Sequence, residues 1–225
     1  YFIMERMDGE QLNNACFSTE EQCWCNEEIA RITAKFHKVS NDKFGYLQNE
    51  LYDNWYLALK SMIEKLIQDI ERAGKHTRRG KKLLFCTEKY KDILKKVPAS
   101  MVNYDLWYGN ILCVKNEDSL KLIIIDPERT FWGDCMFDFA NLEFAKMLDK
   151  KETTLSAYNK IAKTTVSCSK EEMIRFALGI GYLALVQEAE KYYRYTPHHF
   201  GWWRNVSSFL FLYKNSFKIL SRGLK

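Results

Sequence analysis

Several features are missing from this sequence, and each absence narrows the class of protein. No apolar run approaches the ~18–20 residues that a helix needs to cross a bilayer. The opening stretch, Tyr1–Glu5, is too short and carries charge too early for a signal peptide. The seven cysteines include no CxxC pair, and Cys23-Trp24-Cys25 has the wrong spacing for a zinc knuckle. We therefore expect a cytoplasmic protein whose cysteines are idle thiols.

The bulk composition is that of an ordinary globular protein with room for a real core. The 225 residues are 47% hydrophobic and 28% charged, with a net charge of +5. This mild charge permits an anionic ligand such as a nucleotide without demanding nucleic acid. The basic run Lys75–Lys82 is either a phosphate contact or, as we favour, a solvated loop between helices. We expect neither nucleic acid nor membrane as a partner, and the oligomeric state stays open.

Apolar periodicity and capping signals predict a mainly helical chain. Ser18 with Glu21, and Ser169 with Glu172, form the capping-box pattern that opens a helix. The predicted helical segments are 18–39, 54–73, 84–96, one beginning at Asp138, 153–164, 169–193 and 202–220. Strands are predicted at Tyr1–Met4, Ile111–Val114 and Leu120–Ile125, the last two as a hairpin around polar turn residues. The predicted fold class is α+β, predominantly helical, with a central β-hairpin.

Three polar residues flank this hairpin at places where they would meet. Asp105 lies in the loop before it, Asn110 immediately precedes its first strand, and Asp126 follows its second. If the strands pair antiparallel, Asn110 and Asp126 converge at one end, and Asp105 reaches them from the loop. A carboxylate that takes a proton, beside an amide oxygen and a second carboxylate for a hard cation, is the equipment of metal-assisted phosphoryl transfer.

These residues have a plainer interpretation, because Asp and Asn are common in turns. Two observations favour chemistry over turn capping. Asp126 ends a run of three isoleucines, so strong β-formers place a carboxylate at a strand end. Gly133-Asp134 and Asp138 then follow at close spacing.

Four segments resemble the aminoglycoside phosphotransferase and choline kinase-like family of small-molecule kinases. VNYDLWYGNIL resembles its catalytic loop, whose usual form is HGDxxxxN, and IIIDPERTFWGDCMFDFA resembles its IDWE…GDPxxDLA signature. YFIMERMDGEQL resembles its hinge, and ITAKFHKVS its LAxLHxx helix. The resemblance implies a protein-kinase-like fold, with residues 1–9 as hinge strand and linker. Residues 10–225 would then form the helical C-lobe, with a catalytic and metal segment at 101–138 and C-terminal helices at 139–225.

The resemblance also implies roles for individual residues. Asp105 would be the base that accepts or orients the proton of the substrate hydroxyl. Asn110 and Asp126 would hold Mg²⁺ on the phosphates of ATP or GTP. Backbone groups of Glu5 and Met7 would bond the edge of the nucleotide base. The implied reaction moves the γ-phosphate to a hydroxyl of an aminoglycoside-like antibiotic, a sugar or an amino alcohol.

The chain departs from the family pattern in ways that keep a second function open. Asn103 and Tyr104 replace the usual His and Gly, and Cys135 replaces the proline of GDP. No GxGxxG or P-loop occurs, so we expect the phosphate-covering N-lobe to be missing from this chain and its nucleotide affinity to be poor. The alternative is a non-catalytic kinase-like module, either a pseudokinase or a fragment, used for binding or as a scaffold.

Other candidate residues have weaker support. We expect His37 to be a packed helix histidine rather than a base. The resemblance implies that Asp134 and Asp138 hydrogen-bond the catalytic loop and cap the next helix. Glu128 faces either metal, substrate or solvent. The C-terminal aromatic residues are expected to pack in the core, with a substrate cleft as the alternative: Trp202, Trp203, Phe209, Phe211 and Tyr213.

Overall fold

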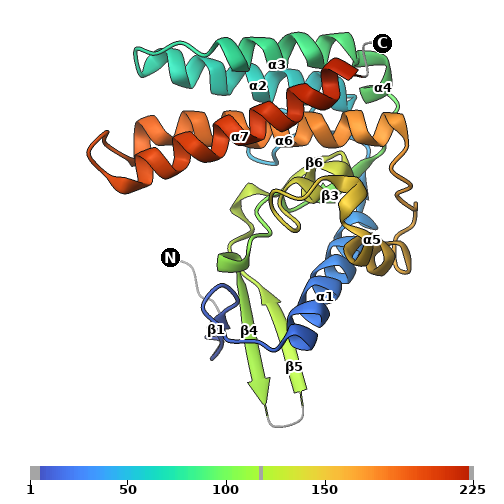
Figure 1. Cartoon of the computed structure of the whole chain (residues 1–225). Helices are drawn as coiled ribbons and strands as arrows, with labels where there is room; N and C mark the ends of the chain where they lie inside the picture. The colour runs from blue at the N-terminus through green and yellow to red at the C-terminus, as the bar shows by residue number, and fades with distance from the viewer. Residues whose placement is uncertain (1–5, 117–118, 223–225) are drawn as a thin grey trace.

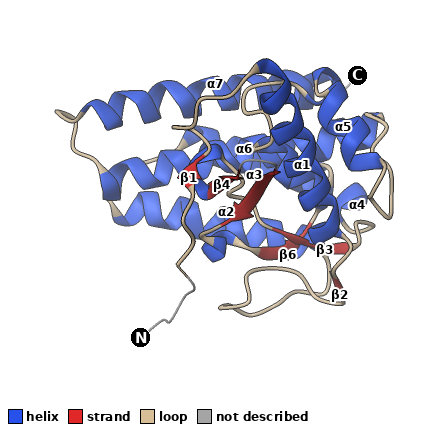
Figure 2. Ribbon diagram, turned by 90° about the horizontal axis from the view of Figure 1, so that it is seen from below, coloured by secondary structure: helices blue, strands red, loops and turns tan. Residues whose placement is uncertain are grey.

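The computed structural model describes residues 6–116 and 119–222, and the predicted strand Tyr1–Met4 lies outside these ranges. The chain is mainly helical (Figures 1 and 2). Its α-helices are α1 (Thr19–His37), α2 (Trp55–Arg72), α3 (Arg78–Lys89), α4 (Lys91–Leu94), α5 (Glu152–Asn159), α6 (Lys170–Arg194) and α7 (Phe200–Arg222). Its strands are β1 (Glu10–Gln11), β2 (Ser40–Asn41), β3 (Ala99–Val102), β4 (Ile111–Asn116), β5 (Ser119–Ile124) and β6 (Phe131–Gly133). Among these helices none combines the length and the hydrophobicity that crossing a membrane requires.

Side-chain caps explain where the long helices begin. Both predicted capping boxes are present, with Ser18 accepting from the Glu21 amide and Ser169 from the Glu172 amide. Thr77 caps α3 by accepting from the Gly80 amide. The prediction that Lys75–Lys82 is a loop and that the helix starts at residue 84 was therefore wrong, because most of the basic run forms the first turns of α3.

The helix predicted to begin at Asp138 is also absent from the described structure. A 3₁₀ segment, η3, covers Cys135–Ala140, and turns follow it. Glu143 and Ala145 have φ values of 46° and 71°, which interrupt any continuation of the helix. The carbonyls freed there are used by the buried Lys151, whose ammonium donates to the oxygens of Leu142 and Glu143. Three further 3₁₀ turns are η1 (Tyr108–Asn110), η2 (Pro127–Arg129) and η4 (Leu148–Lys150).

Two small antiparallel sheets position the site. The predicted hairpin is present as β4 and β5, and β1 adds a third strand, giving the order β1-β4-β5. A second sheet has the order β2-β3-β6, and the sequence analysis missed it because its strands are two to four residues long. Two short connections join the sheets: residues 103–110 run from β3 to β4, and residues 125–130 run from β5 to β6. A third and longer connection, residues 12–39, contains α1 and runs from β1 to β2.

Helices α2, α3, α6 and α7 form layers on one side of these sheets (Figure 1). α2 and α6 pack against each other, α3 packs on both, and α7 packs along α6. The β4–β5 hairpin projects from the other end, with α1 beside it (Figure 1). An aromatic cluster fills the space beneath the second sheet, where Trp55 stacks on Phe131 at 5.5 Å and meets Phe137 edge-on at 4.9 Å.

Candidate functional site

The loop that carries Asp105 begins with a residue in a left-handed conformation. Tyr104 has φ 60°, a region that glycine enters without steric cost and tyrosine does not. Its ring is 1% exposed and lies against Phe131 and Tyr182, each at a centroid distance of 5.4 Å. Its hydroxyl donates to the Gly179 carbonyl of α6 at 2.8 Å. Aromatic burial and this hydrogen bond therefore offset the strain that glycine would avoid.

Asp138 holds the backbone of this loop from below. Its two carboxylate oxygens accept from the amides of Asn103 at 3.1 Å and Tyr104 at 2.6 Å. His37 Nε2 lies 2.9 Å from the same carboxylate, and its Nδ1 lies 2.8 Å from the Tyr158 hydroxyl. The carboxylate is fully buried, so these partners replace its solvation. The expectations that His37 is a packed helix histidine and that Asp138 hydrogen-bonds the loop that carries Asp105 are confirmed.

Asp134 was expected, like Asp138, to hydrogen-bond this loop and to cap the next helix. Its Oδ1 accepts from the Met136 amide at 3.0 Å, which caps η3, and pairs with Arg175 of α6 at 3.1 Å. Asp134 is fully buried, and within the described ranges it makes no hydrogen bond to the loop that carries Asp105. It therefore ties η3 to α6, while the loop that carries Asp105 is held by Asp138 together with other residues.

Asp105 itself is held in place by three neighbours. Its amide donates to Asn103 Oδ1 at 3.0 Å, so the Asn103 side chain helps to fix the loop. Asn110 Nδ2 donates to its carboxylate at 3.0 Å and to its carbonyl at 3.1 Å. Arg129 Nε lies 3.5 Å from its Oδ2. Burial raises the pKa of the Asp105 carboxyl, while the charge of Arg129 and the Asn110 hydrogen bond act in the opposite direction.

The structure brings Asn110 and Asp126 to the same end of the hairpin, as the sequence predicts. The Ile125 amide donates to the Asn110 carbonyl at 3.0 Å, which places Asp126 next to Asn110 across the two strands. Asp126 has φ 56° and an exposed carboxylate. In the described part of the chain, neither Asn110 Oδ1 nor the Asp126 carboxylate has a hydrogen-bond donor.

These free oxygens match the donors that Mg²⁺ prefers, since it usually binds one or two protein oxygens together with phosphates and water. No group of three or more His, Cys, Asp or Glu side chains within residues 6–116 and 119–222 is placed to hold a metal. The residues present therefore fit a cation that arrives with phosphate ligands better than a closed structural metal site.

One face of the hairpin is apolar and uncovered by the core. Ile111 and Cys113 point inward and are buried, whereas Leu112 and Ile123, which are directly paired across the strands, are half-exposed. Neither belongs to the packed core nor contacts it as a neighbour. This face adjoins the Asn110–Asp126 end and offers an apolar floor for a flat ligand. Met7 is half-buried and lies just before β1, which pairs with β4 next to Leu112. Glu5 lies outside the described residues.

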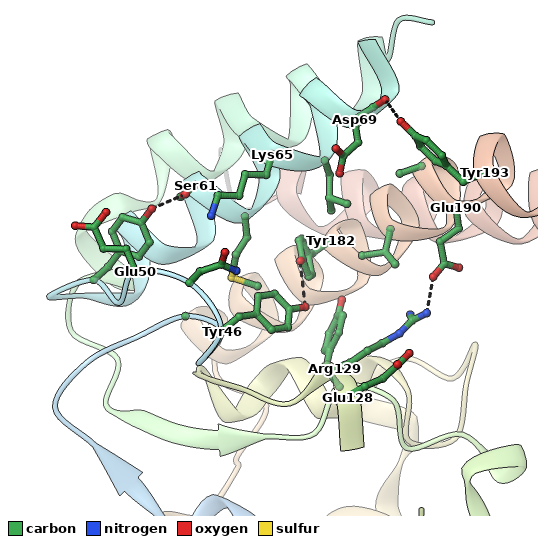
Figure 3. Close-up of a pocket in the computed structure, with 18 of the residues that line it drawn as sticks. Tyr46, Glu50, Ser61, Lys65, Asp69, Glu128, Arg129, Tyr182, Glu190 and Tyr193 are labelled. Carbon is green, nitrogen blue, oxygen red and sulfur yellow. Dashed lines mark hydrogen bonds and ion pairs between the residues drawn. The ribbon is translucent and has the colours of Figure 1, made fainter. Parts of the chain in front are cut away.

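A cavity of about 460 Å³ opens on the other side of Arg129, between α2, α6 and residues 45–52 (Figure 3). Its floor includes Tyr46 and Tyr182, whose hydroxyls are 3.4 Å apart, and its rim includes Lys65 of α2. Arg129 reaches across the cavity edge to Glu190 of α6 (Figure 3). The chain therefore holds a pocket of small-molecule size whose wall contacts Asp105 directly.

The structure decides between the alternatives that the sequence left open for this region. Glu128 is exposed and lines the cavity, so it faces the space for a substrate rather than the core. None of the C-terminal aromatic residues lines it: Phe209 and Tyr213 are in the core, whereas Trp203 and Phe211 are exposed. Lys65, Arg129 and Glu190 were missed by the sequence analysis, because only the packing of α2 and α6 against the 125–130 connection brings them together.

Comparison with known proteins identifies the fold as kinase-like. Neither a family model nor a curated protein matches the chain. Solved structures do, among them a Ralstonia eutropha JMP134 protein described as a candidate aminoglycoside phosphotransferase, with TM-score 0.63 and 14% identity. Choline kinase LicA from Streptococcus pneumoniae matches with TM-score 0.54 and 20% identity. An ethanolamine kinase from Plasmodium vivax matches with TM-score 0.56 and 12% identity.

These matches cover almost all of this chain and part of each neighbour. They include 96%, 84% and 99% of this chain, but 71%, 64% and 68% of the Ralstonia, Streptococcus and Plasmodium chains, respectively. The predicted fold class, α+β and predominantly helical with a kinase-like C-lobe, is confirmed. The fold is one that small-molecule phosphotransferases use, and function has to be argued from the site.

Proposed function

We propose that this chain carries the catalytic floor of a small-molecule kinase, which moves the γ-phosphate of ATP or GTP to a hydroxyl group. The observation that carries the proposal is the joining of Asp105 to Asn110 on one connection, with Asp126 beside Asn110 on the next. One group suited to take a proton therefore adjoins two oxygen donors suited to a hard cation, at the edge of a cavity of small-molecule size.

Asp105 is the proposed base. Its carboxylate would accept or orient the proton of the acceptor hydroxyl, and the Asn110 amide and Arg129 hold it in position. Asn110 Oδ1 and the Asp126 carboxylate would hold Mg²⁺. When bound, Mg²⁺ supplies charge neutralisation on the nucleotide phosphates.

The nucleotide and the acceptor would approach from opposite sides of Asp105. The half-exposed Leu112–Ile123 pair is the proposed floor for the nucleotide base, and the backbone of Glu5 and Met7 would bond its edge. The acceptor would occupy the cavity beside Arg129, because Glu128 and Tyr46 line that space. The acceptor is proposed only as a small hydroxylated molecule, of which antibiotics, sugars and amino alcohols are examples.

A non-catalytic kinase-like module is the second candidate. One observation favours it: Arg129 lies in ion-pair range of the proposed base, 3.5 Å from Oδ2 of Asp105. Such a module would bind a small molecule or a partner protein without transferring phosphate.

Phosphate transfer from γ-labelled ATP and GTP, with Mg²⁺ and a panel of aminoglycosides, sugars, choline and ethanolamine, separates the two candidates. Asp105→Asn should abolish any transfer while the far-UV circular dichroism stays unchanged. Asp149→Asn, at an exposed carboxylate of η4, is the matched control and should retain full turnover. Equal turnover in the Asp105→Asn variant would refute the assignment of the base.

Mg²⁺-dependent nucleotide binding, measured by calorimetry, tests the metal assignment separately from turnover. Asn110→Ala and Asp126→Ala should each weaken binding in Mg²⁺ and leave binding in EDTA unchanged. If wild-type protein transfers no phosphate to any acceptor and binds nucleotide equally with and without Mg²⁺, the non-catalytic module is the better description.

A further inference from the structure

The charge of this chain is unevenly distributed. Residues 75–96 and helix α7 together hold thirteen of the 34 Lys and Arg residues but only two of the 29 Asp and Glu residues. These segments therefore carry a net charge of +11, and the rest of the chain carries −6, against +5 for the whole. Helix α7 contains no acidic residue at all.

The two basic segments lie side by side. Lys82 of α3 places its ammonium 4.4 Å from the ring centroid of Phe217 on α7, and the Tyr90 hydroxyl donates to the Leu220 carbonyl at 3.0 Å. Both helices lie on the side of the molecule away from the hairpin (Figure 1). We call their outer surface the α3–α7 face, defined by the cations Lys82, Lys89, Arg204, Lys214 and Lys218 and the apolar side chains Phe85, Trp203, Leu210 and Phe211.

Large apolar side chains stand out from this face among the cations. Phe85 is 64% exposed, Trp203 61%, Phe211 43% and Leu210 38%. The helical spacing of Trp203, Leu210 and Phe211 places them on one stripe of α7 together with Lys214, opposite the buried stripe that packs on α6, and Phe85 is on α3. Exposed aromatic residues on a surface of one charge sign mark an interaction site rather than scattered surface apolarity.

Two of the anions near this face are already paired. Glu88 of α3 accepts from Lys60 of α2 at 3.0 Å, and Glu71 pairs with Lys81 at 3.2 Å. The described structure shows no carboxylate paired with Arg204, Lys214 or Lys218. These cations are therefore free to meet an anionic partner.

We propose that the α3–α7 face docks on the surface of an anionic phospholipid bilayer. Lys and Arg side chains would meet the lipid phosphates, while Trp203, Phe211 and Phe85 would enter the headgroup boundary. A lipid surface fits better than nucleic acid, because the apolar groups stand on the outer sides of two helices and none of them lines the cavity beside Arg129. The attachment is peripheral. No membrane partner was expected from the sequence, because the basic run Lys75–Lys82 shows no apolar stripe of its own and nothing in the sequence places α7 beside it.

This surface is separate from the candidate active site. The cavity beside Arg129 is lined by α2 and α6 and by residues 45–52, whereas α3 and α7 pack on other sides of those two helices. Docking and ligand binding therefore use different faces. The inference does not depend on the proposed phosphotransferase activity, and its test needs no turnover.

Co-sedimentation of the full chain with vesicles tests the proposal. Vesicles of phosphatidylcholine with phosphatidylserine should bind the protein, and binding should fall as salt rises, whereas pure phosphatidylcholine should not bind it. Lys214→Gln with Lys218→Gln should weaken partitioning about 30-fold, because each lysine near an anionic surface contributes about fivefold. Lys160→Gln with Lys163→Gln removes the same charge from another exposed region and should weaken it less than twofold.

A second pair of variants tests insertion of the apolar side chains. Phe211→Gln should weaken binding severalfold at high salt, where the electrostatic attraction is screened, and Phe144→Gln, at a 48% exposed phenylalanine elsewhere, should not. Equal effects of the two double-lysine variants would overturn the proposal, as would binding to pure phosphatidylcholine. Displacement of the protein from vesicles by a single-stranded RNA oligonucleotide at lower concentration than the lipid would assign the face to nucleic acid instead.

Discussion

Arg129 Nε lies 3.5 Å from Oδ2 of Asp105, although the two residues belong to different connections between the sheets. The same guanidinium pairs with Glu190 of α6, so one cation joins the proposed base to a helix of the cavity wall. An Arg held between two carboxylates has little freedom to reorient, and it restricts Asp105 in turn.

This relationship predicts that Arg129→Gln impairs turnover more than binding. Without the guanidinium, the Asp105 carboxylate loses one of the groups that orient it, and misplacement of a catalytic group costs on the order of tenfold or more in rate. We expect kcat to fall by about tenfold and the KM for nucleotide to change little. Steady-state kinetics with whichever acceptor the transfer assay identifies would measure both.

Arg194→Gln is the matched control, because Arg194 also lines the cavity and lies 3.9 Å from Glu190 but makes no contact with Asp105. Its kcat should equal that of the wild type. If Arg194→Gln lost as much kcat as Arg129→Gln, Arg129 would act by holding Glu190 and the cavity wall and not by orienting Asp105.

The conformation of Tyr104 predicts an unusual order of stability. Glycine would relieve the strain of φ 60° but would remove the ring from the aromatic cluster. Because the lost burial exceeds the relieved strain, Tyr104→Gly should lower the free energy of unfolding by about 2–4 kcal/mol. Tyr104→Phe keeps the ring and loses only the bond to Gly179, so it should cost about 1 kcal/mol. Urea denaturation measures both, and a stabilised Gly variant would contradict this account.

Asp138 is predicted to order the loop that carries Asp105. In Asp138→Asn, an amide NH₂ replaces one of the oxygens that accept from Asn103 N, Tyr104 N and His37. The free energy of unfolding should fall by about 2–4 kcal/mol, because a buried charge-assisted network is broken. Hydrogen exchange should show lost protection at the amides of residues 103 and 104. Protection unchanged from that of the wild type would mean that other contacts hold the loop.

Lys151 predicts a pH dependence of stability. Burial lowers the pKa of its ammonium to about 8, below the value of about 10.4 in an unfolded chain. Between these values the unfolded state binds more protons than the folded state, so the free energy of unfolding should rise with pH. The rise should total about 2–3 kcal/mol from pH 8 to pH 10, before tyrosine ionisation opposes it.

Lys151→Met removes this titrating group and should flatten the profile over the same interval. Chemical denaturation at a series of pH values provides the measurement. If wild type and Lys151→Met show parallel profiles, Lys151 keeps its ordinary pKa in the folded protein.

Local signals predicted much of the helical fold. The two capping boxes located the starts of α1 and α6 because each cap is a hydrogen bond between residues three apart. The second sheet gave no such signal, since β2 and β6 have two and three residues and pair only through β3. The prediction of a helix after Asp138 failed for a related reason, because apolar spacing does not reveal that residues 143 and 145 adopt a left-handed conformation.

The residues of the candidate site also fall into those that local sequence predicts and those that only tertiary packing brings together. Asp105, Asn110 and Asp126 lie close to the hairpin in sequence, so the hairpin register alone predicted their meeting. Arg129 and Glu190 are separated by 61 residues, and nothing in the sequence marks them as partners. The support of Tyr104 by Gly179 is likewise a product of tertiary packing. Groups placed by one local element were foreseeable, and groups joined across helices were not.

The two short connections between the sheets couple any movement of the hairpin to a movement of the candidate site. Residues 103–110 and 125–130 both join the paired strands β4 and β5 of one sheet to the paired strands β3 and β6 of the other. If the hairpin tilts relative to the helices, residues 103–110 and 125–130 must move together. The hydrogen bond from the Ile125 amide to the Asn110 carbonyl opposes sliding of one segment past the other. A tilt would therefore carry Asp105, Asn110 and Asp126 as one unit, while it changes their angle to the cavity that belongs to the helices.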